Sequence, residues 1–312
     1  MPIRNIGYAC QNLSINENVK KKDYITSDRT LRMSGFSLDR CGALALANAK
    51  DLVKIMEWNA RNGVKLFRVG SGIFPFMDHP DLGYSLDDLS WDHRTDIVSE
   101  LVEEGELARQ AGIRLSCHPG PYTCLASPDK TIVDKSIKCL EMHQLIGHLM
   151  GQDDFNINIH VGGVYEGKAE TAKRFCQNFK LLNPQLQNQL TIENDDKASM
   201  WSPTDLYQHI YSGCGVRLTY DYHHHRFCGN ELLDEAVDMM FSTWPEDQVP
   251  DTHYSESAPG KRPQAHSDYI EGPLPEFTTS RQYDVMLETK AKDLALKKYL
   301  TEYSYYKLSN SQ

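Results

Sequence analysis

The chain has 312 residues and a formal net charge of −10; 40% of its residues are hydrophobic and 24% are charged. This composition is typical of a folded globular protein and excludes general disorder. The mean hydropathy of −0.53 and the lack of a long apolar run exclude a transmembrane helix, and residues 1–4 do not begin a signal peptide. We therefore expect an intracellular protein without membrane contact, and a monomer, because nothing in the sequence requires an oligomer.

The excess of acidic side chains argues against a nucleic-acid partner, because binding to phosphates needs positive charge. The net charge is an average over the whole surface, however, and does not exclude a locally basic region. The eight cysteines are scattered and none forms a CxxC pair, which excludes zinc-finger and thioredoxin-type sites. They are expected to be reduced, partly buried thiols.

Short apolar strands alternate with longer amphipathic segments along the whole chain. The predicted strands are Ile3–Ala9, Lys65–Val69, Ile113–Cys117, Asn156–Val161, Gln189–Glu193, Val216–Tyr222, Thr252–Ser255 and Tyr283–Thr289. This alternation predicts a single domain over residues 1–312 with the (β/α)8 fold of a TIM barrel. We expect the barrel to span roughly 3–295 and a C-terminal helix and tail to span 294–312. Residues 250–281 are rich in Pro and Gly, so the helix there is unclear.

Imidazole and carboxylate side chains follow most of the predicted strands. In a barrel these positions meet at one mouth, where the active site lies. Carboxylates gathered there would repel one another unless divalent cations compensated them. Histidine nitrogens and carboxylate oxygens without thiolates suit Zn²⁺, Mn²⁺ or Fe²⁺ better than Ca²⁺, and their number predicts two or three ions. Phosphodiester hydrolysis is the leading reaction class; a metal-dependent sugar isomerase or epimerase remains the alternative.

A series of motifs in fixed order resembles the UV damage endonucleases, relatives of endonuclease IV that share the TIM barrel. The motifs include residues 6–13 (IGYACQNL), 28–32 (DRTLR), 66–70 (LFRVG), 75–80, 115–120 (LSCHPG), 159–163 (IHVGG), 193–195 (END), 221–225, 261–263 (KRP) and 284–288 (DVMLE). Each is weak alone, but together they cover nearly the whole chain.

The resemblance implies a set of metal ligands and a reaction. The ligands would be His79, His118, His160, Glu193, Asp221, His224, His253, His266 and Glu288. Among these, the catalytic residues would be Glu193, Asp221, Glu288 and His253. Manganese is the expected ion, with zinc, magnesium or cobalt as alternatives. The reaction would be incision of damaged double-stranded DNA immediately 5′ of UV photoproducts, leaving 3′-hydroxyl and 5′-phosphate ends. An apurinic-site endonuclease of the endonuclease IV type is the second possibility.

Lesion recognition would require extrusion of the damaged bases, which predicts DNA-contacting residues at the mouth. The expected DNA-contacting residues are Tyr8, Asn12, Arg68, Pro121, Tyr122, Lys261 and Arg262. The chain departs from the family at two positions: Pro121 replaces a glutamine, and Asp251 replaces a lysine two residues before His253. Asp251, or Glu256 in compensation, is therefore a candidate altered ligand, and a protein that binds lesions without cleaving them is a further hypothesis.

Overall fold

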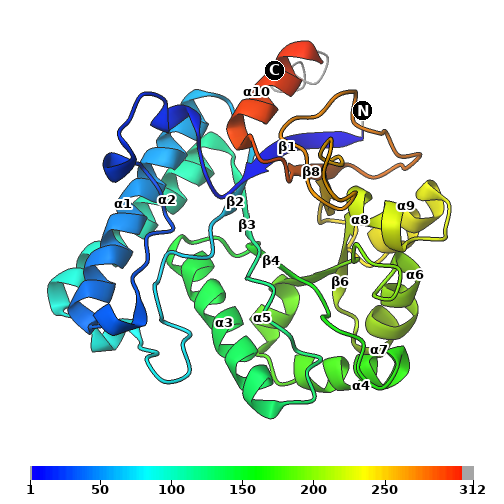
Figure 1. Cartoon of the computed structure of the whole chain (residues 1–312), viewed down its shortest axis with the longest axis horizontal. Coiled ribbons are helices and arrows are strands. Elements are labelled where there is room, and N and C mark those ends of the chain that lie inside the picture. The colour runs from blue at the N-terminus through cyan, green and yellow to red at the C-terminus, as the bar shows by residue number, and fades with distance from the viewer. Residues whose placement is uncertain (1, 304–312) are drawn as a thin grey trace.

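The computed structural model describes residues 2–303, and eight parallel strands in it form a closed barrel in the order β1 to β8 (Figure 1). The strands are β1 (Ile3–Ala9), β2 (Leu66–Val69), β3 (Arg114–Cys117), β4 (Asn156–Ile159), β5 (Leu190–Glu193), β6 (Arg217–Asp221), β7 (Asp251–Tyr254) and β8 (Tyr283–Leu287). The ring closes because β1 pairs with both β2 and β8. The predicted TIM barrel is confirmed, and the strand bounds differ from the predicted ones by at most two residues.

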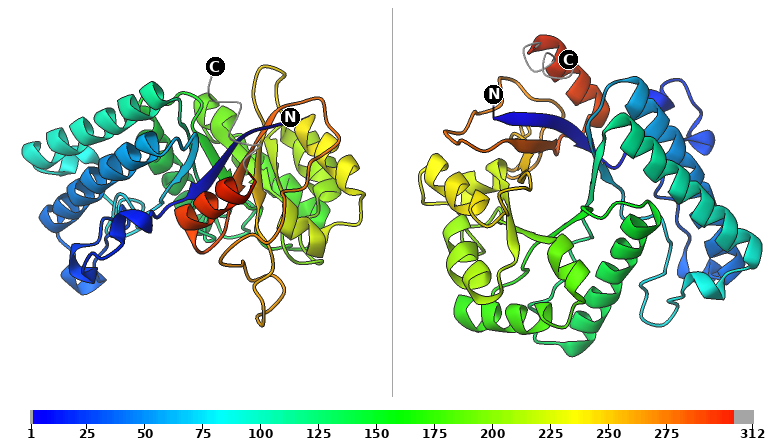
Figure 2. Two further views of the ribbon diagram at one scale, coloured as in Figure 1. Left: turned by 90° about the horizontal axis from the view of Figure 1, so that it is seen from above. Right: turned by 180° about the vertical axis from the view of Figure 1, so that it is seen from behind.

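Helices surround the barrel (Figures 1 and 2). They are α1 (Leu38–Arg61), α2 (Trp91–Ala111), α3 (Lys130–Leu149), α4 (Lys168–Phe179), α5 (Pro184–Gln189), α6 (Pro203–Asp205), a π-helical turn (Leu206–Tyr211), α7 (Ser212–Cys214), α8 (Tyr222–Cys228), α9 (Leu233–Phe241) and α10 (Lys292–Glu302). Short 3-10 turns cover Ser14–Asn16, Lys21–Asp23, Met33–Gly35 and Leu86–Asp88. No helix among residues 2–303 is long and apolar enough to cross a membrane.

Local sequence signals set several helix ends. The Ser90 side chain accepts from the His93 N–H and begins α2, and Gly112 ends that helix with φ of 63°, a left-handed conformation that glycine adopts without strain. Ser202 and Asp205 form a capping box at the start of α6, with Pro203 in its first turn. These signals set the ends of the helices that alternate with the strands.

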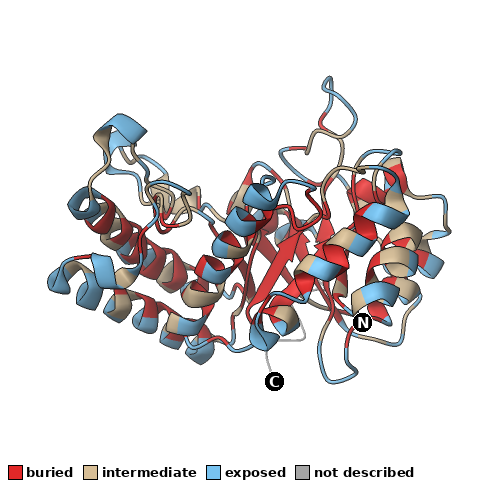
Figure 3. Ribbon diagram, turned by 90° about the horizontal axis from the view of Figure 1, so that it is seen from below, coloured by how far each residue is buried: buried red, intermediate tan, exposed pale blue. Residues whose placement is uncertain are grey.

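The last part of the barrel differs from the regular pattern. Residues 255–282 connect β7 to β8 without a helix, and one isolated bridge joins Ser257 to His266 within this loop. The high proline and glycine content explains the lack of a helix. The C-terminal helix α10 begins at Lys292 rather than 294, and the rest of the expected tail, residues 304–312, lies outside the described residues. The barrel strands are buried, and the outer faces of the helices are exposed (Figure 3).

Candidate metal centre and DNA-facing surface

Glu193, the last residue of β5, lies at the centre of a group of histidines at the carboxyl ends of the strands. Its side chain is 0% exposed. Its Oε2 atom is 3.2 Å from His118 Nε2 and 3.8 Å from His160 Nε2. His118 follows β3 and His160 follows β4, so three consecutive strands position these side chains. Together the three residues form a group that could hold one metal ion.

A second group shares Glu193 with the first. It consists of Glu193, Asp221, His253 and Glu288, which come from β5, β6, β7 and the end of β8. His253 Nδ1 is 3.0 Å from Glu193 Oε2 and 3.4 Å from Glu288 Oε1. Because the two groups share one carboxylate, the arrangement suits two neighbouring divalent ions.

The donor atoms of both groups fit a divalent cation. Glu193 Oε1, Asp221 Oδ2 and His253 Nδ1 are buried and have no hydrogen-bond partner among the described residues, which is costly unless something else binds them. Burial raises the pKa of Asp221 to about 7, despite the nearby His224. Buried carboxylates with unsatisfied oxygens beside imidazole nitrogens are the donors that Mn²⁺ and Zn²⁺ accept.

His224, His266 and His79 were also expected as ligands, and the structure places them differently. His224 Nδ1 is 3.2 Å from Glu193 Oε1 and 2.8 Å from the Asn194 carbonyl oxygen. The His266 ring centre lies 6.2 Å from that of His224, and its Nδ1 is 2.7 Å from the Ser255 hydroxyl. Both therefore border the centre. The His79 Nδ1 accepts hydrogen bonds from two N–H groups of its own loop, and neither metal group includes His79.

Two polar side chains that the sequence reasoning did not single out hold the centre together. Asn158 donates from Nδ2 to Glu193 Oε2 at 2.5 Å, and Asp195 Oδ1 is 3.2 Å from His160 Nδ1. Burial by itself lowers the pKa of His160, but Glu193 and Asp195 raise it to about 9. Asn158 lies two residues before His160, and residues two apart along a strand point to the same face. This spacing could have identified Asn158 from the sequence as a neighbour of the metal centre.

Arg68 lies inside the centre rather than on its rim. It is a buried residue of β2, and its Nη1 is 2.5 Å from Glu288 Oε1. Burial raises the pKa of Glu288, but the charge of Arg68 outweighs it and the pKa is well below the usual range. The expectation that Arg68 contacts DNA from the surface is therefore not what the structure shows.

Tyr8 and Asn12 are also buried, contrary to the expectation that they stand at the mouth. Tyr8 is 0% exposed, its hydroxyl donates to Asn59 Oδ1 at 2.6 Å, and Asn12 Nδ2 donates to that hydroxyl at 2.8 Å. Both side chains are therefore satisfied within the core. The position of Tyr8 near the end of β1 did not reveal this, because the partner Asn59 comes from α1.

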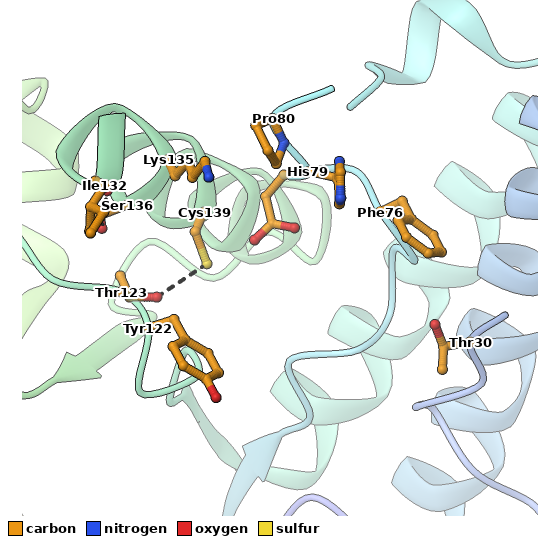
Figure 4. Close-up of a pocket in the computed structure, with 11 residues that line it drawn as sticks. Thr30, Phe76, His79, Pro80, Tyr122, Thr123, Ile132, Lys135, Ser136 and Cys139 are labelled. Atoms are coloured by element: carbon orange, nitrogen blue, oxygen red, sulfur yellow. Dashed lines mark hydrogen bonds between the residues drawn. The ribbon is translucent and has the colours of Figure 1, made fainter. Parts of the chain in front are cut away.

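Tyr122 and three other predicted DNA contacts are exposed. Tyr122 is 91% exposed, and Pro121, Lys261 and Arg262 are exposed as well. Tyr122 lines a cavity of about 590 Å³ between the loops that follow β2 and β3 (Figure 4). His79 and Phe76 lie on the opposite wall of this cavity, and α3 forms its side. Lys261 lies close to Lys290, and its charge lowers the pKa of Lys290.

Comparisons with known proteins identify the family to which this arrangement belongs. The model of the UV-endonuclease UvdE family matches residues 4–311. The chain belongs to the UvdE family. It is 33% identical over 311 residues to a UV-damage endonuclease of Schizosaccharomyces pombe, and 31% identical over 277 residues to a UV DNA damage endonuclease of Bacillus mycoides. These matches cover 93% and 85% of the chain.

The UvdE relatives differ in length and agree in fold. The chain spans 49% of the Schizosaccharomyces pombe protein and 84% of the Bacillus mycoides protein. The crystal structure of SacUVDE superposes with a TM-score of 0.82 at 30% identity, covering 96% of this chain and 99% of that one. The resemblance drawn from the motifs is therefore confirmed along the whole barrel.

The two acidic residues suggested as altered ligands in this UvdE chain lie away from both metal groups. Asp251 begins β7, at the end of the barrel opposite the centre, where its Oδ2 is 3.5 Å from Asn156 Nδ2. Burial lowers the pKa of Arg114, but Asp251 and Asp284 raise it, so Asp251 belongs to a buried charge network at the barrel floor. Glu256 accepts from the Tyr254 hydroxyl and the Glu271 N–H. Neither acid belongs to one of the two metal groups.

Proposed function

We propose that this protein is a metal-dependent DNA repair endonuclease that incises double-stranded DNA immediately 5′ of UV photoproducts. The products would carry 3′-hydroxyl and 5′-phosphate ends. One observation supports this most directly: two candidate metal groups share the buried carboxylate of Glu193 in a chain of the UvdE family.

We propose that His118, His160 and Glu193 hold one divalent ion and that Glu193, Asp221, His253 and Glu288 hold a second. His224 and His266, which border the centre, and His79 are the remaining candidate ligands for a third. Bound there, divalent ions activate water and neutralise the charge that develops on the oxygens of an in-line phosphodiester displacement. Manganese is the ion we expect, with zinc, magnesium or cobalt as alternatives.

The chain itself would orient the ligands before DNA binds. Asn158 fixes one oxygen of Glu193, and Asp195 contacts His160 through Nδ1, which leaves Nε2 facing Glu193. The Asn194 carbonyl oxygen contacts His224 Nδ1. Partners of this kind set the ring orientation of metal-binding histidines, and their loss typically costs about 10–100-fold in affinity or activity.

The exposed residues at the mouth would bind the substrate. A phosphodiester reaches a recessed metal centre more easily when the damaged bases leave the base stack. This extrusion costs less free energy for damaged bases than for normal ones. Tyr122 is exposed beside the apolar cavity and could fill the gap left in the duplex, with Pro121 as a wedge. Lys261 and Arg262 supply positive charge for the phosphates, so the net charge of −10 does not exclude DNA.

An incision assay with end mapping tests the proposal. A duplex with one defined pyrimidine dimer and a duplex with one abasic site are incubated with the protein and Mn²⁺, and the cut position and end groups are read on a sequencing gel. We expect a nick directly 5′ of the dimer. Efficient cutting of the abasic duplex alone would favour the apurinic-site alternative. Tight lesion binding without a nick at saturating Mn²⁺ would identify a binding protein that has lost catalysis, and no salt-sensitive DNA affinity would favour a sugar isomerase.

A further inference from the structure

Arg68 contacts two of the four side chains of the second metal group, which are Glu193, Asp221, His253 and Glu288. Its Nη1 is 2.5 Å from Glu288 Oε1, and its Nη2 is 2.7 Å from His253 Nε2. The Arg68 side chain is 7% exposed, so water screens its charge only weakly. A permanently charged guanidinium is therefore fixed directly beside this group.

The contact with His253 has a consequence for the other ring nitrogen. A guanidinium has only donors, so His253 Nε2 must accept, and a neutral ring that accepts at Nε2 carries its proton on Nδ1. Nδ1 is the nitrogen that lies 3.0 Å from Glu193 Oε2 and 3.4 Å from Glu288 Oε1. A cation bound among these residues needs the lone pair of Nδ1 and the charge of Glu288, and Arg68 engages both.

The first metal group, His118, His160 and Glu193, has no direct contact of this kind. Within residues 2–303, the hydrogen bonds and ion pairs of these three side chains involve Asn158, Asp195, other histidines and the Pro119 carbonyl, and no arginine or lysine. Arg68 acts on this group only through its charge, which adds to burial in lowering the pKa of His118. Arg68 therefore opposes a dication by direct contact only at the second group, although the two groups share Glu193.

We propose that Arg68 competes with the divalent ion at the second group and so weakens ion binding there. Arg68 must give up its contact with His253 when an ion enters this group, because the ring proton then moves to Nε2 and faces the guanidinium. Two positive charges a few ångströms apart in a buried site repel strongly, which raises the cost of ion binding at this group. This inference rests on the proposed ion binding and not on nuclease activity.

Calorimetric titration of the full chain with Mn²⁺, after removal of metals by a chelator, tests the competition. We expect two binding steps for the native protein. The Arg68→Met substitution removes the charge but keeps an unbranched apolar side chain, and one step should tighten by about 10-fold or more, the scale on which neighbours of metal ligands change affinity. Arg68→Lys keeps the charge and should leave both affinities near the native values. Arg226→Met changes the same charge at an exposed residue and is the matched control.

The outcomes separate this inference from the proposed function. An Arg68→Met variant in which neither step tightens would overturn the competition and assign Arg68 a supporting role. The same tightening in Arg68→Lys would also overturn it. Thermal unfolding in chelator checks that the variants fold, and Arg68→Gln replaces Arg68→Met if that variant does not. Binding in two steps without any DNA nicking would overturn the proposed function alone, and no Mn²⁺ binding by any variant would overturn both.

Discussion

Glu193→Gln is the substitution that should affect the metal centre most, because this carboxylate belongs to both groups. Glutamine keeps the size of the side chain and removes its charge. The carboxylate is fully buried, with His118 Nε2 at 3.2 Å, His253 Nδ1 at 3.0 Å and Asn158 Nδ2 at 2.5 Å. The change therefore leaves the packing nearly intact and isolates the effect of one negative charge.

The size of the effect follows from the distances. Two unit charges 4 Å apart interact by about 4 kcal/mol at an effective dielectric constant of 20, and by about twice that when one is a dication. Even if relaxation and water recover roughly three quarters of that interaction, about 2 kcal/mol is lost, or about 30-fold in affinity at each group. The pKa of His160, which Glu193 and Asp195 hold at about 9 against the effect of burial, should fall in the variant.

Mn²⁺ titration, histidine NMR and the incision assay measure these effects. We expect at least about 30-fold weaker Mn²⁺ binding and a loss of incision of at least about 100-fold in Glu193→Gln, which is within the range seen when a charged transition-state contact is removed. Glu256→Gln is the matched control, because Glu256 lies outside both groups and contacts Tyr254 and Glu271 instead. Native Mn²⁺ affinity in Glu193→Gln, or an equal loss in Glu256→Gln, would refute the reasoning.

Three further effects should be measurable. Tyr122→Ala should weaken binding to dimer-containing duplex by about 5–150-fold, the equivalent of about 1–3 kcal/mol of stacking, and should leave the unfolding temperature unchanged. Leu181→Ala removes another exposed side chain and should change neither the DNA binding nor the unfolding temperature. In chelator, the unfolding temperature should decrease as the pH rises from about 6.5 to 9. The raised pKa of His160 makes its protonated form stabilising, and that form is lost over this window. A flat profile would contradict this expectation. Glu104 is buried, both of its oxygens lack a hydrogen-bond partner among residues 2–303, and burial raises its pKa to about 8. Glu104→Met should therefore stabilise the fold by about 1–3 kcal/mol in urea unfolding, and more at pH 8 than at pH 5 because the native carboxyl resists ionisation. Equal gains at both pH values would argue against it.

The barrel and the residues at its mouth could be predicted because both depend on local patterns. Alternation of apolar strands with amphipathic helices is read along the chain, and a polar residue that follows a parallel strand must lie at the same end of the barrel as the others. His118, His160 and Glu193 each come at or directly after a strand, so their convergence followed from the fold class. The loop over residues 255–282 lacks the helix that the fold normally has, and its composition already indicated this.

The sequence by itself determined which residue types reach the mouth, but only the tertiary structure decided their depth and direction. Asp251 and His253 share one face of β7, yet they lie about 6.6 Å apart along the strand, so the first joins the charges of the barrel floor and the second the metal centre. Tyr8 lies near the end of β1 and Tyr122 follows β3, but the first is enclosed by the core and the second is 91% exposed. Arg68 lies inside the barrel, where it forms a salt bridge with Glu288. Such outcomes depend on contacts between segments far apart in the chain, which no local pattern records.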